Sequence, residues 1–171
     1  MISKHLFKKL NEQLTFELYS SHIYLDMAAY CYSQDLDGFA NFFKVQAEEE
    51  RFHGMKFFSY INERNGDIKI GGLDSPRNEY ESVLDVFEKA YEHEQEVTRR
   101  IYELSDVATE EKEHATISFL KWFIDEQVEE EANFVTIIKK LKRIKNDPTA
   151  IYMLDAELAQ RVFTPPVATQ A

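Results

Sequence analysis

Apolar residues recur at alternating steps of three and four along four long stretches of the chain, a spacing that keeps side chains on one face of a helix. The stretches cover about residues 4–34, 38–65, 80–108 and 111–144. All four prolines lie outside the strongly periodic parts, as expected if these parts are helical, because a proline inside a helix removes a hydrogen bond. The pattern therefore predicts four long helices.

The links between these stretches predict how the helices pair. A tight link around Asp35, Asp37 and Gly38 joins the first and second stretches, and another around Thr109 and Glu110 joins the third and fourth. Short links produce antiparallel neighbours, whereas residues 65–77 between the second and third stretches can cross a whole bundle. We expect an all-α fold, an antiparallel four-helix bundle with one long crossover between helices two and three.

A stop signal and a new helix start follow the fourth stretch. Asp147 suits the N-cap and Pro148 the first turn of a short fifth helix, which would place Ile151, Leu154 and Leu158 on one side. We therefore expect the bundle over residues 1–145, the short fifth helix within 146–163 and a loose tail over 164–171.

Composition narrows the setting of this helical chain. Its 171 residues carry 20 basic and 31 acidic side chains, a formal net charge of −11, which argues against nucleic acid as a partner. No uncharged run approaches the roughly 20 residues of a membrane span. Lys4, Lys8 and Lys9 interrupt any apolar stretch near the N-terminus, so we expect no export signal there. The single cysteine, Cys31, cannot form an internal disulfide, so we expect a cytoplasmic protein.

Polar residues interrupt all four apolar stripes near their middles. They are Glu17 in the first stretch, Glu50 and His53 in the second, Glu94 in the third, and Gln127 and Glu130 in the fourth. Glu17 lies 33 residues before Glu50 and 36 before His53. Glu94 lies 33 residues before Gln127 and 36 before Glu130. Matched spacing in two hairpins puts these positions at similar heights, so we predict one polar layer with pseudo-twofold symmetry inside the core.

Such a layer needs a countercharge, because a buried unpaired carboxylate costs several kcal/mol. The stripes supply no Lys or Arg there, so a multivalent cation is favoured, and oxygen ligands with one imidazole suit iron, manganese or zinc. A single glutamate at a position such as Glu17 or Glu94 is more often a residue at the edge of the apolar stripe, with its carboxylate in solvent. The matched spacing of all these residues on four helices favours a metal centre instead. The other histidines are interpreted as surface or packing residues: His5, His22, His93 and His114.

These residues resemble the motifs of bacterial non-haem ferritins over nearly the whole chain. The motifs are Glu17 on the first helix, Glu49-Glu50-x-x-His53 on the second, Glu94 on the third and Gln127-x-x-Glu130 on the fourth. The resemblance implies a di-iron centre in which Glu17, Glu50 and His53 hold one iron. It implies a second iron held by Glu50, Glu94 and Glu130, with Glu50 bridging and Gln127 beside it.

The same resemblance implies a third iron site formed by Glu49, Glu126 and Glu129, with Glu130 shared. Glu126 and Glu129 are i,i+3 neighbours just off the inward stripe, and Glu49 adjoins Glu50, so an acidic cluster is geometrically reasonable. An ordinary solvated acidic face is the alternative interpretation.

The resemblance also extends to two aromatic residues near the predicted centre, and the two residues after Glu50 bear on whether haem is expected. Tyr24, one heptad beyond Glu17, resembles the tyrosine that ferritins keep beside the centre as a hydrogen-bond partner and electron donor. Trp122 would join the same electron supply, and simple packing is the alternative for both aromatics. Haem-containing relatives place a methionine between the Glu and His of the second-helix motif. Arg51 and Phe52 stand there in this chain, so no haem is expected.

The resemblance implies an iron-storage protein with ferroxidase activity, in which O₂ or H₂O₂ oxidises Fe(II) and Fe(III) passes to a mineral inside a hollow shell. Permanent di-iron enzymes in related bundles usually carry a second Glu-x-x-His where this chain has Gln127-x-x-Glu130. We hypothesise that this difference weakens retention of the second iron and lets it leave as product.

Large apolar residues off the stripes exceed what one bundle can bury and indicate subunit contacts. They include Phe16, Ile23, Tyr30, Tyr32, Phe42, Phe52 and Phe58. By resemblance, the assembly is a homo-oligomeric shell of 24 subunits with the fifth helix at its fourfold axes.

Three other functions are weighed against iron storage. The first is a di-iron or manganese–iron oxidase or peroxidase, but the rubrerythrins among these usually append a Cys-x-x-Cys domain, which one cysteine excludes. The second is a DNA-protecting relative, which builds its iron site between subunits and usually lacks the fifth helix. The third is a purely structural or cofactor-carrying helical shell, which would be indicated by a metal site without oxidation activity.

Overall fold

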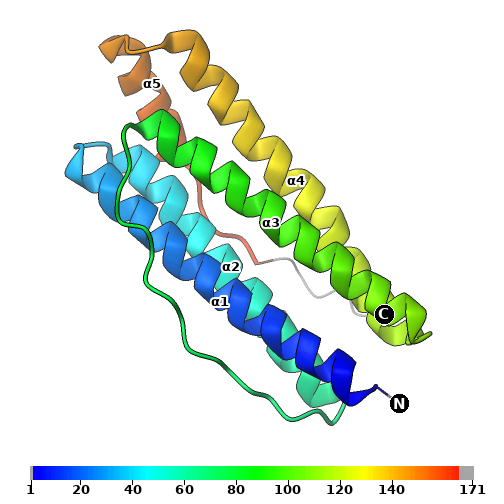
Figure 1. Ribbon diagram of the computed structural model, residues 1–171. Helices are drawn as coiled ribbons and strands as arrows, with labels where there is room; N and C mark the ends of the chain where they lie inside the picture. Colours follow the sequence, from blue (N-terminus) through cyan, green and yellow to red (C-terminus); the bar gives the residue numbers. More distant parts are fainter. Residues whose placement is uncertain (1, 166–171) are drawn as a thin grey trace.

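The computed structural model describes residues 2–165, which form five helices and no strand. They are α1 (Lys4–Ser33), α2 (Asp37–Glu63), α3 (Val83–Glu110), α4 (His114–Ile144) and α5 (Pro148–Leu158). Figure 1 shows α1 to α4 as one long bundle with α5 at one end. The predicted fold class is confirmed, while residues 166–171 of the expected tail lie outside the described range.

The long crossover connects the two hairpins of the bundle. α1 packs along α2 and α3 along α4, while residues 64–82 run past α1 from one end of the bundle to the other (Figure 1). Side chains of α1 hold this segment in place at both of its ends. The Asn11 amide donates to the Asp67 carbonyl at 3.0 Å, and the Tyr80 hydroxyl donates to Asp26 at 2.8 Å.

The ends of α3 differ from their predicted positions. Thr109 and Glu110, expected in a link, lie inside α3, and the turn falls at residues 111–113, where Lys112 has a φ of 56°. Polar residues alone do not end a helix, so the prediction was wrong about which residues form the turn. At the other end, the helix begins after Ser82, whose hydroxyl accepts from the Asp85 amide at 3.1 Å.

The link between α1 and α2 is also shifted from its predicted residues, and a side chain distant in the sequence contacts the start of α2. Asp37 and Gly38 belong to α2, and the turn covers residues 34–36 around Asp35. The Asp155 carboxylate of α5 accepts from the amides of Gly38 at 2.8 Å and Phe39 at 3.0 Å. This remote side chain supplies hydrogen-bond acceptors that the first turn of α2 otherwise lacks.

The start of α5 agrees with its prediction. The Asp147 carboxylate accepts from the Ala150 amide at 2.9 Å, and Pro148 occupies the first turn. Leu154 and Leu158 are buried against the bundle. None of the helices described in residues 2–165 is long and apolar enough to cross a membrane.

The apolar core is divided into two clusters along the bundle axis. One cluster lies toward α5 and includes Phe39, Phe43, Phe87 and Phe134. The other lies toward the opposite end and includes Leu6, Leu10, Phe57, Ile101 and Leu120. Buried polar side chains of all four long helices lie where the two clusters meet: Glu17, Gln46, Glu50, His53, Glu94, Gln127 and Glu130. The core is therefore interrupted by one polar layer.

The apolar residues expected at subunit contacts are buried to different degrees. Phe42 is only 4% exposed because it packs within the chain, with the Arg161 guanidinium 4.3 Å from its ring centre. Its assignment to a subunit contact was therefore wrong. Tyr32 is 47% exposed, and the others are partly buried.

Candidate metal centre

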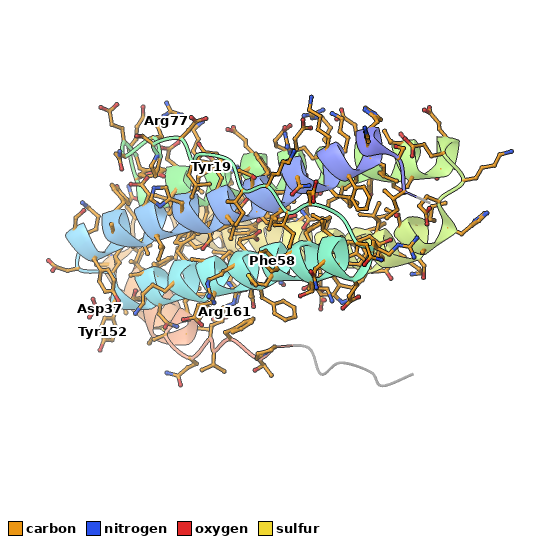
Figure 2. The ribbon with its side chains drawn as sticks, turned by 90° about the horizontal axis from the view of Figure 1, so that it is seen from below. Tyr19, Asp37, Phe58, Arg77, Tyr152 and Arg161 are labelled. Atoms are coloured by element: carbon orange, nitrogen blue, oxygen red, sulfur yellow. The ribbon has the colours of Figure 1, made fainter. Side chains whose placement is uncertain are left out.

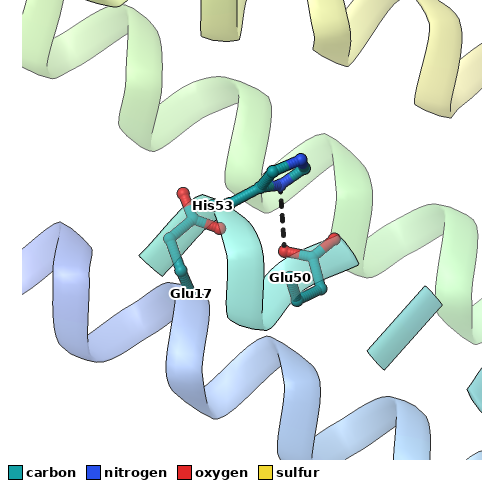
Figure 3. A group of neighbouring side chains, drawn as sticks. All are labelled: Glu17, Glu50 and His53. Carbon is teal, nitrogen blue, oxygen red and sulfur yellow. Dashed lines mark ion pairs between the residues drawn. The ribbon is translucent and has the colours of Figure 1, made fainter. Parts of the chain in front are cut away.

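Three side chains from two helices meet in the polar layer. Glu17 comes from α1, and Glu50 and His53 come from successive turns of α2, one turn apart on the same face (Figure 3). One potential ligand atom from each lies within 4.8 Å of the others, and all three side chains are buried. This is the one group of its kind among residues 2–165.

The second hairpin contributes Glu94 from α3 with Gln127 and Glu130 from α4. The Gln127 amide donates to the Glu94 carboxylate at 3.0 Å. The Gln46 amide of α2 donates to Glu130 at 2.8 Å and to Glu50 at 3.4 Å. These amides therefore connect carboxylates from different helices and hold the two halves of the layer together.

Burial controls the ionisation of these carboxyl groups. It is the largest cause raising the pKa of Glu17 and Glu50 well above the ordinary value, and repulsion from neighbouring carboxylates adds to it. Burial also raises the pKa of Glu94, although hydrogen bonds from Tyr24 and Gln127 oppose the shift. The pKa of Glu130 rises to about 8, first through burial and then through the charge of Glu94. Without a cation, the layer retains protons near neutral pH.

The layer contains acceptors that no protein donor satisfies. Glu17 Oε2, Glu50 Oε2 and Gln46 Oε1 are buried and have no hydrogen-bond partner. Within residues 2–165, no Lys or Arg forms an ion pair with Glu17, Glu50, Glu94 or Glu130. Carboxylate oxygens with one imidazole fit a transition-metal cation, which would satisfy these acceptors and replace the retained protons.

The two candidate aromatic residues occupy different places around the layer. The buried Tyr24 hydroxyl donates to the Glu94 carboxylate, and burial raises the pKa of Tyr24, so this phenol stays protonated. The ring centre of Trp122 lies 5.4 Å from that of His53 in an edge-on contact. Trp122 also packs edge-on against Phe123 at 4.8 Å. Both residues contact ligand candidates directly.

The acidic residues predicted for a third site lie at the outer side of the layer. Glu49 and Glu126 are partly buried, whereas Glu129 is exposed. Burial raises the pKa of Glu49 and of Glu126, and the charge of Glu129 raises both further. The three side chains are therefore electrostatic neighbours. They do not form a second compact ligand group within residues 2–165, and Glu49 is paired with Arg161.

The remaining histidines agree with their interpretation as surface or packing residues. His5, His22 and His114 are exposed. His93 stacks on Phe16 at 5.4 Å, and its Nε2 lies 2.8 Å from the Ser20 hydroxyl. Burial lowers the pKa of His93 to about 4, so its ring is neutral.

Sequence reasoning did not single out three residues that contact the candidate ligands. Gln13 donates to Glu17 at 2.8 Å, and Gln46 contacts both Glu50 and Glu130. Each glutamine lies four residues before a candidate ligand on the same helix, so this spacing was an available signal. Arg161 had no such signal, because it reaches Glu49 from beyond α5.

Comparisons with known proteins agree with this geometry. The family model described as a ferritin-like domain matches residues 7–144. A bacterial non-heme ferritin of Staphylococcus aureus is 48% identical over 163 residues, covering 95% of this chain and 98% of the relative. The corresponding protein of Staphylococcus saprophyticus has the same identity and coverage.

Solved structures give the same result in three dimensions. An engineered closed form of the Archaeoglobus fulgidus ferritin superposes with a TM-score of 0.95 at 45% identity, covering 96% of this chain and all of that chain. The open-pore ferritin of the same organism gives 0.94 at 44% identity, covering 95% and 100% of the two chains. The chain therefore belongs to the ferritin family, as the resemblance of its helix motifs predicted.

Proposed function

We propose that this protein stores iron and oxidises Fe(II) at a centre inside each subunit. The observation that carries the proposal is the buried group of Glu17, Glu50 and His53, whose ligand atoms lie within 4.8 Å of one another. Two carboxylate oxygens of this group have no hydrogen-bond partner, although His53 Nδ1 lies 3.6 Å from Glu50 Oε2. A folded chain tolerates such a group more easily when a cation binds there, and the ferritin relatives support iron as that cation.

In the proposed reaction, one Fe(II) binds to Glu17, Glu50 and His53, and a second binds to Glu50, Glu94 and Glu130. Each Fe(II) gives up one electron. When O₂ is the acceptor, it takes two electrons and two protons and leaves as H₂O₂; when H₂O₂ is the acceptor, its O–O bond breaks and two water molecules form. The protons displaced from the carboxyl groups of the layer are available for this reduction.

Tyr24 and Gln127 are proposed to orient the second iron position. Both donate hydrogen bonds to the carboxylate of Glu94, so they fix its rotamer. Tyr24 is also placed to supply an electron, and Trp122 lies against His53 on the other side of the layer. Glu49, Glu126 and Glu129 are proposed to form an outer third iron site that shares Glu130.

The proposed assembly is a homo-oligomeric shell of 24 subunits that encloses the ferric mineral, with α5 at the fourfold axes. α5 packs on α2 and α4 at one end of the bundle, which is compatible with a contact between several copies at that end. The buried Cys31, which forms no disulfide within the described residues, is consistent with the cytoplasm as the expected compartment.

The site assignment is tested by replacing the shared carboxylate. Glu50→Ala should lower the initial rate of Fe(II) oxidation in air to near the buffer rate, because both proposed iron positions use Glu50. Glu48→Ala is the matched control, since Glu48 lies two residues away on the exposed side of α2. An initial rate in Glu50→Ala equal to that of the control would exclude this site.

The asymmetry of the two hairpins gives a second test. Gln127→Glu replaces the neutral amide beside Glu94 with a carboxylate, which should hold the second iron longer and slow repeated turnover. Stopped-flow mixing with successive additions of Fe(II) measures that turnover. Equal rates of the second and later additions in both proteins would contradict the proposed role of Gln127.

A further inference from the structure

Arg161 connects the segment after α5 to the outer acidic residues of the layer. Its guanidinium donates to the Glu49 carboxylate in an ion pair whose side chains are only 21% and 22% exposed. The same guanidinium donates to the Phe42 carbonyl at 3.3 Å and lies 4.3 Å from the Phe42 ring centre. Figure 2 shows Arg161 on this segment beside α2.

The backbone around Arg161 is held independently of this ion pair. The Asn41 amide of α2 donates to the carbonyl of Arg161 at 2.9 Å and to that of Leu158 at 3.2 Å. Two residues beyond Arg161, the Phe163 ring packs 6.0 Å from the ring of Phe52. These contacts on both sides of Arg161 hold its backbone in a position from which its side chain reaches Glu49.

The inner and outer carboxylates therefore differ in their countercharge. Glu17 and Glu50 each keep a buried oxygen without a hydrogen-bond partner, whereas Glu49 has a guanidinium from its own chain. Lys56 lies 4.1 Å from the Trp122 ring centre and interacts electrostatically with Glu126. A metal that binds at the outer position therefore competes with the positive charges of Arg161 and Lys56 for these carboxylates.

We propose that Arg161 is a built-in competitor for the outer metal position and sets how tightly that position binds iron. The inference rests on the proposed outer site of Glu49, Glu126 and Glu129. A metal takes the Glu49 carboxylate only after the guanidinium leaves it, so the energy of the ion pair is subtracted from metal binding. The outer position consequently holds iron weakly and releases it, while the inner positions fill first.

Titration of the metal-free shell with Zn²⁺ tests this competition without any oxidation. Isothermal calorimetry should resolve the tighter inner binding events from a weaker outer event in each subunit. Arg161→Gln should tighten the outer event about tenfold, which corresponds to about 1.4 kcal/mol, and leave the inner events unchanged. Arg161→Lys keeps the charge but loses the planar guanidinium that donates to Glu49 and to the Phe42 carbonyl from two different nitrogens, so it should give a smaller gain in affinity.

Two further comparisons separate the competition from a general change in charge or folding. Lys140→Gln is the matched control, because Lys140 pairs with Glu157 of α5 at 2.6 Å on an exposed surface. It should leave the outer event as in the unchanged protein. Glu49→Gln should abolish the gain, so adding Arg161→Gln to it should change nothing further.

The outcomes distinguish this inference from the proposed function. Equal outer affinity in Arg161→Gln and the unchanged protein overturns the inference while the outer site stands. Absence of an outer event in every variant overturns both the inference and the outer site, but the inner events still support the ferroxidase centre. Absence of the inner events would contradict the proposed function itself. A gain that persists in the Glu49→Gln background would show that Arg161 acts elsewhere, and it would overturn the inference.

Discussion

Glu130→Gln should make the metal-free protein more stable at neutral pH while removing a proposed metal ligand. Glu130 is only 4% exposed, and its pKa rises to about 8 through burial and the nearby charge of Glu94. The unfolded chain loses this proton near the ordinary value of 4.5, but the folded chain keeps it. Because folding then requires a proton to be taken up, stability falls as the pH rises from the unfolded pKa toward the folded one.

The size of the effect follows from the distance between the two pKa values. At pH 7, the folded group retains its proton over about 2.5 pH units in which the unfolded group is ionised, a ceiling of about 3 kcal/mol at 1.36 kcal/mol per unit. Glutamine keeps the shape and can still accept from Gln46, which donates to Glu130 at 2.8 Å. Neighbouring carboxyl groups share the penalty, so we expect a gain of about 1–3 kcal/mol.

Differential scanning calorimetry of metal-free protein at equal subunit concentration measures this gain. At roughly 2–4 °C per kcal/mol for a chain of this size, the melting temperature should rise by roughly 2–12 °C at pH 7. The gain should be small at pH 5 and larger at pH 8. Glu48→Gln makes the same chemical change at an exposed position and should have little effect. A lower melting temperature in Glu130→Gln, or a gain independent of pH, would refute the reasoning.

Three further predictions concern the centre and the end of the bundle. Zn²⁺ affinity should increase between pH 6 and pH 8, because the metal displaces protons from carboxyl groups of raised pKa; calorimetry in buffers of different ionisation enthalpy should detect that release, and its absence would count against the raised values. Tyr24→Phe removes the hydroxyl that donates to Glu94 and should slow Fe(II) oxidation several-fold without changing the helical circular dichroism; an unchanged rate would limit Tyr24 to packing. Gly38→Ala should displace α5, since its Cβ would lie 1.7 Å from the Asp155 carbonyl oxygen, and hydrogen exchange should accelerate in α5 but not in Gly72→Ala, where nothing lies within 4 Å.

The fold was predictable because its main signals are local. Helical stripes depend on spacing within one helix, and the equal intervals in the two hairpins are enough to place Glu17, Glu50 and Glu94 at similar heights. The helix ends were less predictable. Thr109 and Glu110 continue α3 because no intrinsic breaker stands there, and the turn at Lys112 depends on how the hairpin closes.

The parts of the site that the sequence did not reveal depend on contacts between distant residues. Asp155 caps the start of α2 from 117 residues away, and Arg161 reaches Glu49 across 112 residues. Neither contact leaves a periodic pattern in the chain. Gln13 and Gln46 differ from these, because their four-residue spacing from a carboxylate could have marked them as hydrogen-bond partners.

The most direct test of the proposed function is to measure Fe(II) oxidation and particle size in the same experiment. Purified protein is stripped of metal and mixed with Fe(II) in air, while ferric absorbance and the size of the species that carries it are recorded together. Iron storage predicts oxidation well above the buffer rate and a ferric signal that travels with a particle of many subunits. Oxidation at the buffer rate, or a species of single-subunit size, would contradict it.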